Sequence, residues 1–270
     1  MPDLTLIDTW PVDHAAAAAL LPDGTIETHG AVDRPFRLAS VTKVLVAVAV
    51  HAATEDGTIS LDDPAGPPGA TVAHLLAHAS GLSPDSDATL ARPGERRIYS
   101  NRGFEVLGEL LLARSGLSAA QWVDEAVAAP LGMVGTRLDG SPANGAIGTA
   151  GDLIRLAADL LAAAPVLLAA PTRDRATSVA FADLAGVLPG FGAQDPNPWG
   201  LGVEVRGTKW PHWTPQNASA ATFGHFGRSG TFVWCDPEHR CALVALTDRE
   251  FGDWAPPLWT ALGERVVDAI

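Results

Sequence analysis

The chain has 270 residues, of which 47% are hydrophobic and 18% are charged, a composition typical of a globular protein and not of a disordered one. Its formal net charge of −13 argues against nucleic acids and anionic membranes as partners, because both require a basic face. No apolar run reaches the roughly 18 residues of a transmembrane helix, and the N-terminus lacks the basic segment of a secretory signal, so we expect a cytoplasmic protein.

The first half of the chain predicts a strand pair followed by helices. Residues 14–21 and 25–30 flank a Pro-Asp-Gly turn, which is typical of a β-hairpin. From Ser40 onward, apolar residues recur at helical spacing, and Gly57 is placed to end that helix. Further helices, indicated by their caps and periods, are expected at residues 71–77, 104–115, 118–128 and 149–164.

The second half of the chain returns to a strand pattern. Residues 165–198 are rich in Ala, Pro and Gly and show no clean period, so we expect a loop with helical fragments there. After Trp199, apolar residues alternate at period two, which is typical of antiparallel strands. The expected strands cover residues 201–205, 231–235 and 243–247, and a helix over 257–269 closes the chain.

This order of elements predicts an α/β (α+β) fold. An antiparallel sheet would be built from both chain ends, with flanking helices and an inserted, mostly helical lobe. We expect a single domain over residues 1–270, with a sheet lobe of about 1–60 and 199–270 and a helical lobe of about 61–198. A catalytic site would lie in the crevice between the two lobes.

Ser40 and Lys43 are the first residues that point to chemistry. The chain has only two lysines and one tyrosine, and one lysine stands three residues after a serine at the start of a predicted helix. A serine hydroxyl needs an adjacent base to become a nucleophile, and residues one helical turn apart share a face. The helix N-terminus would also place the Ser40 N–H beside a developing oxyanion. Taken alone, an N-cap serine and a solvated lysine explain the pair equally well.

Two later motifs strengthen the catalytic interpretation. Tyr99 opens a Tyr-Ser-Asn triplet, and a phenolate beside a lysine ammonium has a lowered proton affinity, so Tyr99 is predicted to act as a base. Asn101 offers a donor and an acceptor, suited to holding a substrate amide or ester and to orienting the lysine. A predicted strand carries His225 and Gly227, and it could supply a second oxyanion N–H from Arg228.

In this order, Ser-x-x-Lys, Tyr-x-Asn and His-x-Gly resemble the serine β-lactamase and penicillin-binding-protein superfamily. The most similar branch is the class C-like one, which includes family VIII carboxylesterases and D-aminopeptidase-type hydrolases. The resemblance extends from about residue 22 to residue 246. Segments that agree with it lie at residues 78–82, 99–104, 130–133 and 224–227.

The resemblance implies a role for each motif residue. Ser40 would be the acylated nucleophile, and Lys43 with Tyr99 would activate it and later the deacylating water. The N–H groups of Ser40 and Arg228 would form the oxyanion hole. The residues that would bind substrate are Asn101, His225, Gly227 and Arg228.

The third motif departs from the family pattern. The family often has Lys-Thr-Gly or Lys-Ser-Gly there, where the cation and the hydroxyl hold a carboxylate. This chain has His225 and Phe226 instead, so carboxylate recognition should be weak unless Arg228 or Arg102 replaces it. The helical insertion is also short for this branch. Both features favour an ester or a small amide over efficient β-lactam hydrolysis.

The sequence therefore predicts a serine hydrolase that acts through an acyl-enzyme on Ser40 and cleaves an ester, a small amide or a β-lactam. The alternative is a catalytically idle copy of the fold, kept as a binding or scaffolding protein. We expect a small-molecule partner, no nucleic acid, no membrane and no cofactor. No metal is expected either, because His74 and His78 have zinc-ligand spacing without a third ligand.

Several residues outside the motifs have no catalytic role assigned to them, or have two possible roles. Cys235 and Cys241 flank a turn-like segment and could face each other across a hairpin, although two reduced thiols packed in a sheet are favoured in a cytoplasmic chain. Lys209 is interpreted as a surface or cleft-rim residue. The tryptophans nearby, which could line an acyl pocket or fill the core, are Trp199, Trp210 and Trp213.

Overall fold

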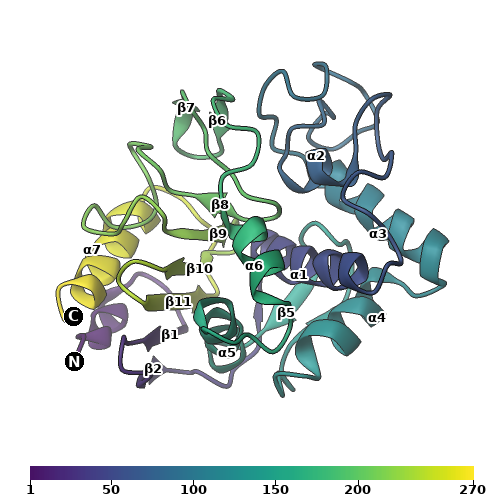
Figure 1. Ribbon diagram of the computed structural model, residues 1–270. Helices are drawn as coiled ribbons and strands as arrows, with labels where there is room; N and C mark the ends of the chain where they lie inside the picture. The colour runs from purple at the N-terminus through teal and green to yellow at the C-terminus, as the bar shows by residue number, and fades with distance from the viewer.

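A six-stranded antiparallel sheet forms the centre of the computed structural model, which describes residues 1–270 (Figure 1). Its strand order is β2-β1-β11-β10-β9-β8, so strands from the N-terminus pair with strands from the C-terminal third. This confirms the predicted sheet built from both chain ends. The strands are β1 (Ala15–Leu20), β2 (Ile26–Gly30), β8 (Glu204–Val205), β9 (Phe223–Gly227), β10 (Thr231–Asp236) and β11 (Cys241–Thr247).

Two hydrophobic layers cover the two faces of this sheet. On β1, Ala16 and Ala18 belong to the larger core, whereas Ala17 and Ala19 belong to the smaller one, as the period-two alternation of a strand requires. Helix α5 (Ala150–Leu161) packs on one face, against β1, β10 and β11. Helix α7 (Ala255–Val267) and the 3₁₀ segment η1 (Leu4–Thr9) cover the other face, near both chain ends (Figure 1).

Helix α1 (Thr42–Glu55) runs through the middle of the molecule, between the sheet and the helices of residues 72–123 (Figure 1). It is buried on nearly every side, from Thr42 to Ala53, because its residues are apolar around the whole circumference. It contacts helices on several sides. The helical part comprises α2 (Val72–Leu76), α3 (Asn101–Ser115), α4 (Ala119–Val123), the π-helical turn η3 (Asp124–Ala128) and α6 (Ala170–Thr177).

The structure differs from the predicted elements in three places. The strand predicted at 201–205 reduces to the two residues of β8, because the backbone bends in the glycine-containing stretch before it. Residues 165–198 contain α6, one of the helical fragments expected in that loop, and also a β-hairpin that was not expected. Helix α5 packs on the sheet although its residues fall in the predicted helical lobe. The remaining strands are β3 (Phe36–Arg37), β4 (Arg137–Leu138), β5 (Ala146–Gly148), β6 (Gly186–Leu188) and β7 (Gly192–Gln194).

The two cysteines lie on opposite faces of the sheet. Across the β10–β11 pair, Cys235 faces Ala242, and Cys241 faces Asp236. Cys235 belongs to the larger core and Cys241 to the smaller one, so the two thiols point apart and both are free. The disulfide that the hairpin position left open is therefore ruled out by the register.

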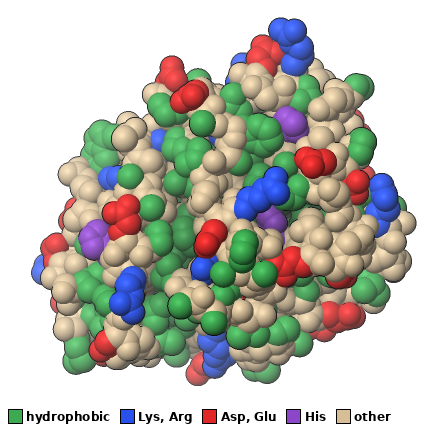
Figure 2. Space-filling view, in the orientation of Figure 1, with side chains coloured by type: hydrophobic (Ala, Val, Ile, Leu, Met, Phe, Trp, Pro, Cys, Tyr) green, Lys and Arg blue, Asp and Glu red, His purple; other side chains and the backbone are tan.

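Acidic and basic side chains are interspersed over the face of the molecule in Figure 2, with hydrophobic side chains between them. None of the helices is both long enough and apolar enough to cross a membrane.

Candidate active site

Ser40 lies on a single 3₁₀ turn, η2 (Ala39–Val41), immediately before α1. The preceding residue, Ala39, has a φ of 45°, a left-handed conformation that is uncommon for a residue with a side chain. This sharp turn leads the chain from β3 into the buried helix and leaves Ser40 partly exposed. Lys43 follows in the first turn of α1 and is fully buried. Its Nζ lies 3.5 Å from Ser40 Oγ, so the structure brings the predicted pair together.

The Lys43 amine is surrounded by neutral groups. Its Nζ donates to Asn101 Oδ1 at 2.7 Å and to the carbonyl oxygen of Ala143 at 2.9 Å. It also lies 4.7 Å from the centre of the Tyr99 ring and 5.5 Å from that of Phe104. The lysine forms no salt bridge. Asn101 therefore sits where the sequence predicted it, with its oxygen toward the lysine.

Burial lowers the pKa of Lys43 to about 7, even though the nearby charges of Asp85 and Glu105 act in the opposite direction. An ordinary lysine holds its proton at neutral pH, with a pKa of about 10.4. Near pH 7, the free amine and the ammonium forms of Lys43 are therefore present in similar amounts. A free amine can accept the proton of a neighbouring hydroxyl, which an ammonium cannot.

The expected low proton affinity of Tyr99 is wrong. Its ring is half-buried, but the hydroxyl lies among buried groups, 3.5 Å from His225 Nε2. Burial raises the pKa of Tyr99 well above its ordinary value, and a hydrogen bond with the Ser40 side chain only partly offsets this. The expectation depended on a fully charged Lys43, whereas Lys43 loses much of its own charge near neutral pH. Tyr99 is consequently a neutral phenol.

His225 projects from β9 toward Tyr99. Its Nδ1 lies 2.7 Å from the carbonyl oxygen of Phe226 and donates to it, which leaves Nε2 as an acceptor facing the phenol. Burial, and then the charge of Lys43, lower the pKa of His225 to about 3. The imidazole is thus neutral at pH 7. The Phe226 side chain points to the other face of the sheet and packs against Trp259, so it does not line the site.

Gly227 allows β9 to lie against the segment that carries Ser40. A Cβ at this position would stand 2.3 Å from the carbonyl oxygen of Leu38, which is far inside contact distance. Thr231 Oγ1 donates to the same oxygen at 3.0 Å, and Ser229 Oγ donates to that of Arg37 at 2.6 Å. These bonds hold the turn after β9 against the residues just before Ser40.

The two predicted oxyanion donors are unused within the protein. Neither the Ser40 N–H nor the Arg228 N–H donates a hydrogen bond to another protein group. The Arg228 side chain is 85% exposed, and its Nε lies 3.9 Å from Glu250. Arg102, the other arginine considered for a substrate carboxylate, is already engaged in ion pairs with Asp87 and Glu109. Only Arg228 is therefore available at the rim.

Trp199 and His78 form the buried wall behind Tyr99. The Trp199 ring packs against Tyr99, His78 and His225, at centroid distances of 5.9, 4.7 and 5.5 Å. His78 Nδ1 accepts from the Ser100 N–H at 3.2 Å, which places the ring beneath the Tyr-Ser-Asn triplet. His78 lies beyond the end of α2, so it does not share a helix face with His74. The described chain has no cluster of three metal-ligating side chains.

The expectation that Lys209 lies at the surface is also wrong. The residue is only 3% exposed, and its Nζ lies 2.6 Å from Glu204 Oε1. Glu204 on β8 also accepts from His212 Nε2 at 2.7 Å and from Trp213 Nε1 at 2.8 Å. Lys209 Nζ further donates to Asn197 Oδ1 at 3.3 Å. This cluster lies behind Trp199, because Trp199 Nε1 also donates to Asn197 Oδ1. Of the three tryptophans near this segment of the chain, Trp199 and Trp213 are buried and Trp210 is exposed.

Asp85 is a neighbour of the site that the sequence did not indicate. Its Oδ1 accepts from Asn101 Nδ2 at 2.8 Å. Asp85 is exposed and lies in an irregular loop, so no motif or period marks it.

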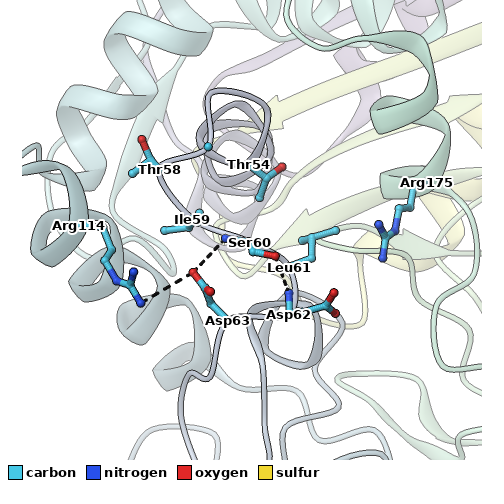
Figure 3. A pocket seen from close by; sticks show the side chains of 10 residues that line it. Thr54, Thr58, Ile59, Ser60, Leu61, Asp62, Asp63, Arg114 and Arg175 are labelled. Carbon is cyan, nitrogen blue, oxygen red and sulfur yellow. Dashed lines mark hydrogen bonds and ion pairs between the residues drawn. The ribbon is translucent and has the colours of Figure 1, made fainter.

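A cavity of about 550 Å³ lies elsewhere, at the opposite end of α1 (Figure 3). It is open and mostly polar, with Arg114 and Arg175 on opposite sides, and Asp63 forms an ion pair with Arg114 at 3.9 Å. Ser40 precedes the first residue of α1, whereas Thr54 of the cavity is near its last, roughly 20 Å away at 1.5 Å per residue. This cavity is therefore separate from the candidate active site.

Known proteins resemble this chain in sequence and in fold. A family model described as Beta-lactamase matches residues 14–264. The crystal structure of a β-lactamase (Mb2281c) from Mycobacterium bovis is 53% identical, with a TM-score of 0.96 and 98% of each chain covered. SurE, solved with D-Leu, is 25% identical with a TM-score of 0.79, covering 98% of this chain and 73% of SurE.

A curated relative is matched over a shorter stretch. The D-alanyl-D-alanine-carboxypeptidase/endopeptidase AmpH of Escherichia coli is 29% identical over 147 residues, which cover 41% of this chain and 38% of AmpH. The chain thus matches about two fifths of the length of that relative.

Proposed function

Because the chain belongs to the β-lactamase family of serine hydrolases, we propose that it forms an acyl-enzyme on Ser40 and hydrolyses an ester or a small amide. One observation carries this proposal. The buried Lys43 amine lies 3.5 Å from Ser40 Oγ, lacks a carboxylate partner and has a pKa lowered by burial to about 7. A structural lysine would gain from an ion pair, whereas a general base needs a free amine near the working pH.

In the acylation step, the Lys43 amine takes the proton of the Ser40 hydroxyl while Oγ attacks the acyl carbon of the substrate. The negative charge that develops on the carbonyl oxygen is stabilised by the N–H groups of Ser40 and Arg228. The Tyr99 phenol donates its proton to the leaving group as the acyl–heteroatom bond breaks. The Lys43 ammonium then returns a proton to the tyrosine.

In the deacylation step, water replaces the leaving group. The Lys43 amine takes a proton from the water, whose oxygen attacks the acyl carbon of the ester on Ser40. The ester bond breaks, the Lys43 ammonium returns its proton to Ser40 Oγ, and the free acid leaves. Before the proton transfer, the neutral His225 accepts from the Tyr99 hydroxyl and holds it at the site, and this hydrogen bond is released when the phenol donates to the leaving group.

The substrate preference follows from the charges at the rim. His225 is neutral and Arg102 is engaged, so Arg228 is the one cation available to a substrate carboxylate. This weak anchor favours esters and small amides over β-lactams. The names of the relatives extend the candidates to D-amino-acid derivatives, since one is a D-alanyl-D-alanine carboxypeptidase and another was solved with D-Leu.

Covalent labelling tests the nucleophile. We expect a fluorophosphonate probe to add one mass increment to the intact protein, located on Ser40 by peptide mass spectrometry, and the Ser40→Ala variant to stay unmodified. A panel of short-chain p-nitrophenyl esters, nitrocefin and D-alanyl peptides then ranks the substrates. An unlabelled Ser40 without turnover of any panel member would replace this proposal with the idle, ligand-binding alternative.

The Tyr99→Phe variant tests the proton donor. It removes only the hydroxyl that faces His225 and leaves the ring that packs against Trp199. We expect kcat to fall about a hundredfold, the usual contribution of a general acid or base, while the melting temperature changes little. A near-wild-type kcat for this variant would remove Tyr99 from the mechanism.

A further inference from the structure

Each of the two acceptors that hold the Lys43 amine is connected to a carboxylate, the first directly and the second through the hydroxyl of Ser141. The first acceptor is Asn101 Oδ1, and the amide nitrogen of the same side chain donates to Asp85 Oδ1 at 2.8 Å. An amide has one donor end and one acceptor end, so a carboxylate on the nitrogen fixes the oxygen toward the lysine. The loop is well placed for this, because the Pro84 carbonyl oxygen accepts from the Asn101 N–H at 2.7 Å.

The second acceptor is the carbonyl oxygen of Ala143, at the end of a turn that begins at Ser141. Ser141 Oγ accepts from the Ala143 N–H at 3.2 Å and donates to Glu105 Oε1 at 3.2 Å. Glu105 lies on α3, one turn beyond Asn101, and its side chain is 40% exposed. It therefore anchors the turn that presents the Ala143 oxygen to the lysine.

We propose that Asp85 and Glu105 are positioning residues, which hold the two hydrogen-bond acceptors of Lys43 in place and set the charge state of its amine from outside the site. Neither carboxylate contacts Lys43 or any reacting atom in this arrangement. The effect of these two residues on the rate rests on the proposed function, in which Lys43 is the base. Their effect on the protonation of Lys43 does not depend on that function.

The electrostatic surroundings of Lys43 leave these two carboxylates as its dominant charges. Burial makes the three titratable rings around it neutral, since it raises the pKa of Tyr99 and lowers those of His78 and His225. Asp85 and Glu105 are the charged groups that favour the ammonium, against the larger effect of burial. Removing either charge should therefore lower the pKa of Lys43 and increase the fraction of free amine at pH 7.

The scarcity of lysine makes a direct measurement practical. With lysine labelled by ¹³C at Cε, the protein should give only two side-chain signals, from Lys43 and Lys209, and a Lys43→Arg variant assigns them. The pH titration of the Lys43 signal is then compared between the wild type and the variants Asp85→Asn and Glu105→Gln. These variants remove a charge but keep an oxygen that can accept the same hydrogen bond.

Matched controls come from the neighbouring carboxylates. Asp87 lies two residues after Asp85 in the same loop, and Glu109 lies one turn after Glu105 on α3. Both pair with Arg102, as Glu105 Oε2 also does at 3.6 Å, but neither bonds to Asn101 or to Ser141. We expect Asp85→Asn and Glu105→Gln to move the Lys43 midpoint to lower pH, and Asp87→Asn and Glu109→Gln to move it much less. Equal midpoints in all four variants and the wild type would overturn the proposal.

A second variant separates positioning from charge. Asp85→Ala removes the acceptor of the Asn101 amide as well as the charge, so the amide can rotate. We expect this variant to lose about tenfold or more in kcat at its own optimal pH, and Asp85→Asn to recover most of that loss. If the Asp85→Ala and Asp85→Asn variants have equal kcat values, Asp85 has no positioning role. If the midpoints shift while Ser40 stays unlabelled, the inference holds and the proposed function fails.

Discussion

The two lysines of this chain are both buried, yet their surroundings differ in one decisive respect. Lys43 has an amide oxygen and a backbone carbonyl as acceptors and no carboxylate in contact. Lys209 lies 2.6 Å from Glu204, with both side chains at most 1% exposed. The first arrangement leaves the amine free to exchange its proton, and the second fixes it as an ammonium in an ion pair.

Glu204, the carboxylate that pairs with Lys209, shows in its own pKa how this pair differs from the surroundings of Lys43. Burial alone would raise the pKa of Glu204, but Lys209 and His212 hold it well below its ordinary value. Burial lowers the pKa of Lys209, and Glu204 acts against that shift. The pair is therefore charged and mutually dependent. A buried lysine is a candidate base only where such a partner is missing.

Replacing Lys43 by Met should produce the largest effect. The change removes the proposed base and keeps an unbranched, apolar side chain that is one atom shorter, so we expect kcat/KM to fall about 10³-fold or more, within the range for general-base catalysis. The melting temperature should stay within a few degrees of the wild type, because no ion pair is broken. Steady-state kinetics and thermal unfolding measure the two quantities. A large loss of stability with retained activity would make Lys43 a structural residue.

The same replacement at Lys209 should give the reverse result. Lys209→Met leaves Glu204 buried with two donors instead of three, and breaking a buried pair from one side typically costs about 3–5 kcal/mol of unfolding free energy. We expect kcat/KM to be nearly unchanged below the melting temperature, since Lys209 lies behind Trp199 and away from Ser40. Denaturant unfolding and ester kinetics provide the test.

A double variant serves as the control for Lys209. Adding Glu204→Gln to Lys209→Met removes the uncompensated charge, so part of the lost stability should return. If instead Lys209→Met lowers kcat/KM more than tenfold in folded protein, the cluster around Glu204 positions the Trp199 wall. Lys209 would then contribute to activity as well as to stability.

The sequence was sufficient to predict which residues meet. Ser40, Lys43, Tyr99, Asn101 and His225 come from distant segments, and their types and order predicted the site because acyl transfer requires those groups together. The sheet from both chain ends followed from the period-two alternation near each end. The hairpin predicted at residues 14–21 and 25–30 is β1–β2, with Ala16 opposite Gly30.

The sequence was insufficient wherever burial decides the outcome. The proton affinity of Tyr99 depends on how far the hydroxyl is withdrawn from water, which residue spacing does not show. Lys209 appeared exposed because its partner, Glu204, belongs to a two-residue strand whose pairing is set by the neighbouring β9. Asp85 acts through a loop without any regular period. These three errors concern the surroundings of single residues, and none of them concerns which motif residues come together.

The pH dependence of the rate is the smallest of the expected effects, and it is the most direct test of the difference between the free Lys43 amine and the ion-paired Lys209. Only the free amine of Lys43 can take the Ser40 proton, so below pH 7 kcat/KM should fall about tenfold for each pH unit, and above pH 7 it should approach a plateau. The Lys209→Met variant should keep the same midpoint, because its ammonium is engaged with Glu204 and takes no part in the proton transfer. Rates for one activated ester between pH 5 and 9, with folding checked at each pH, supply the profile. A midpoint well above 8 for the wild type would mean that Lys43 remains an ammonium at neutral pH, and the role of base would pass to Tyr99.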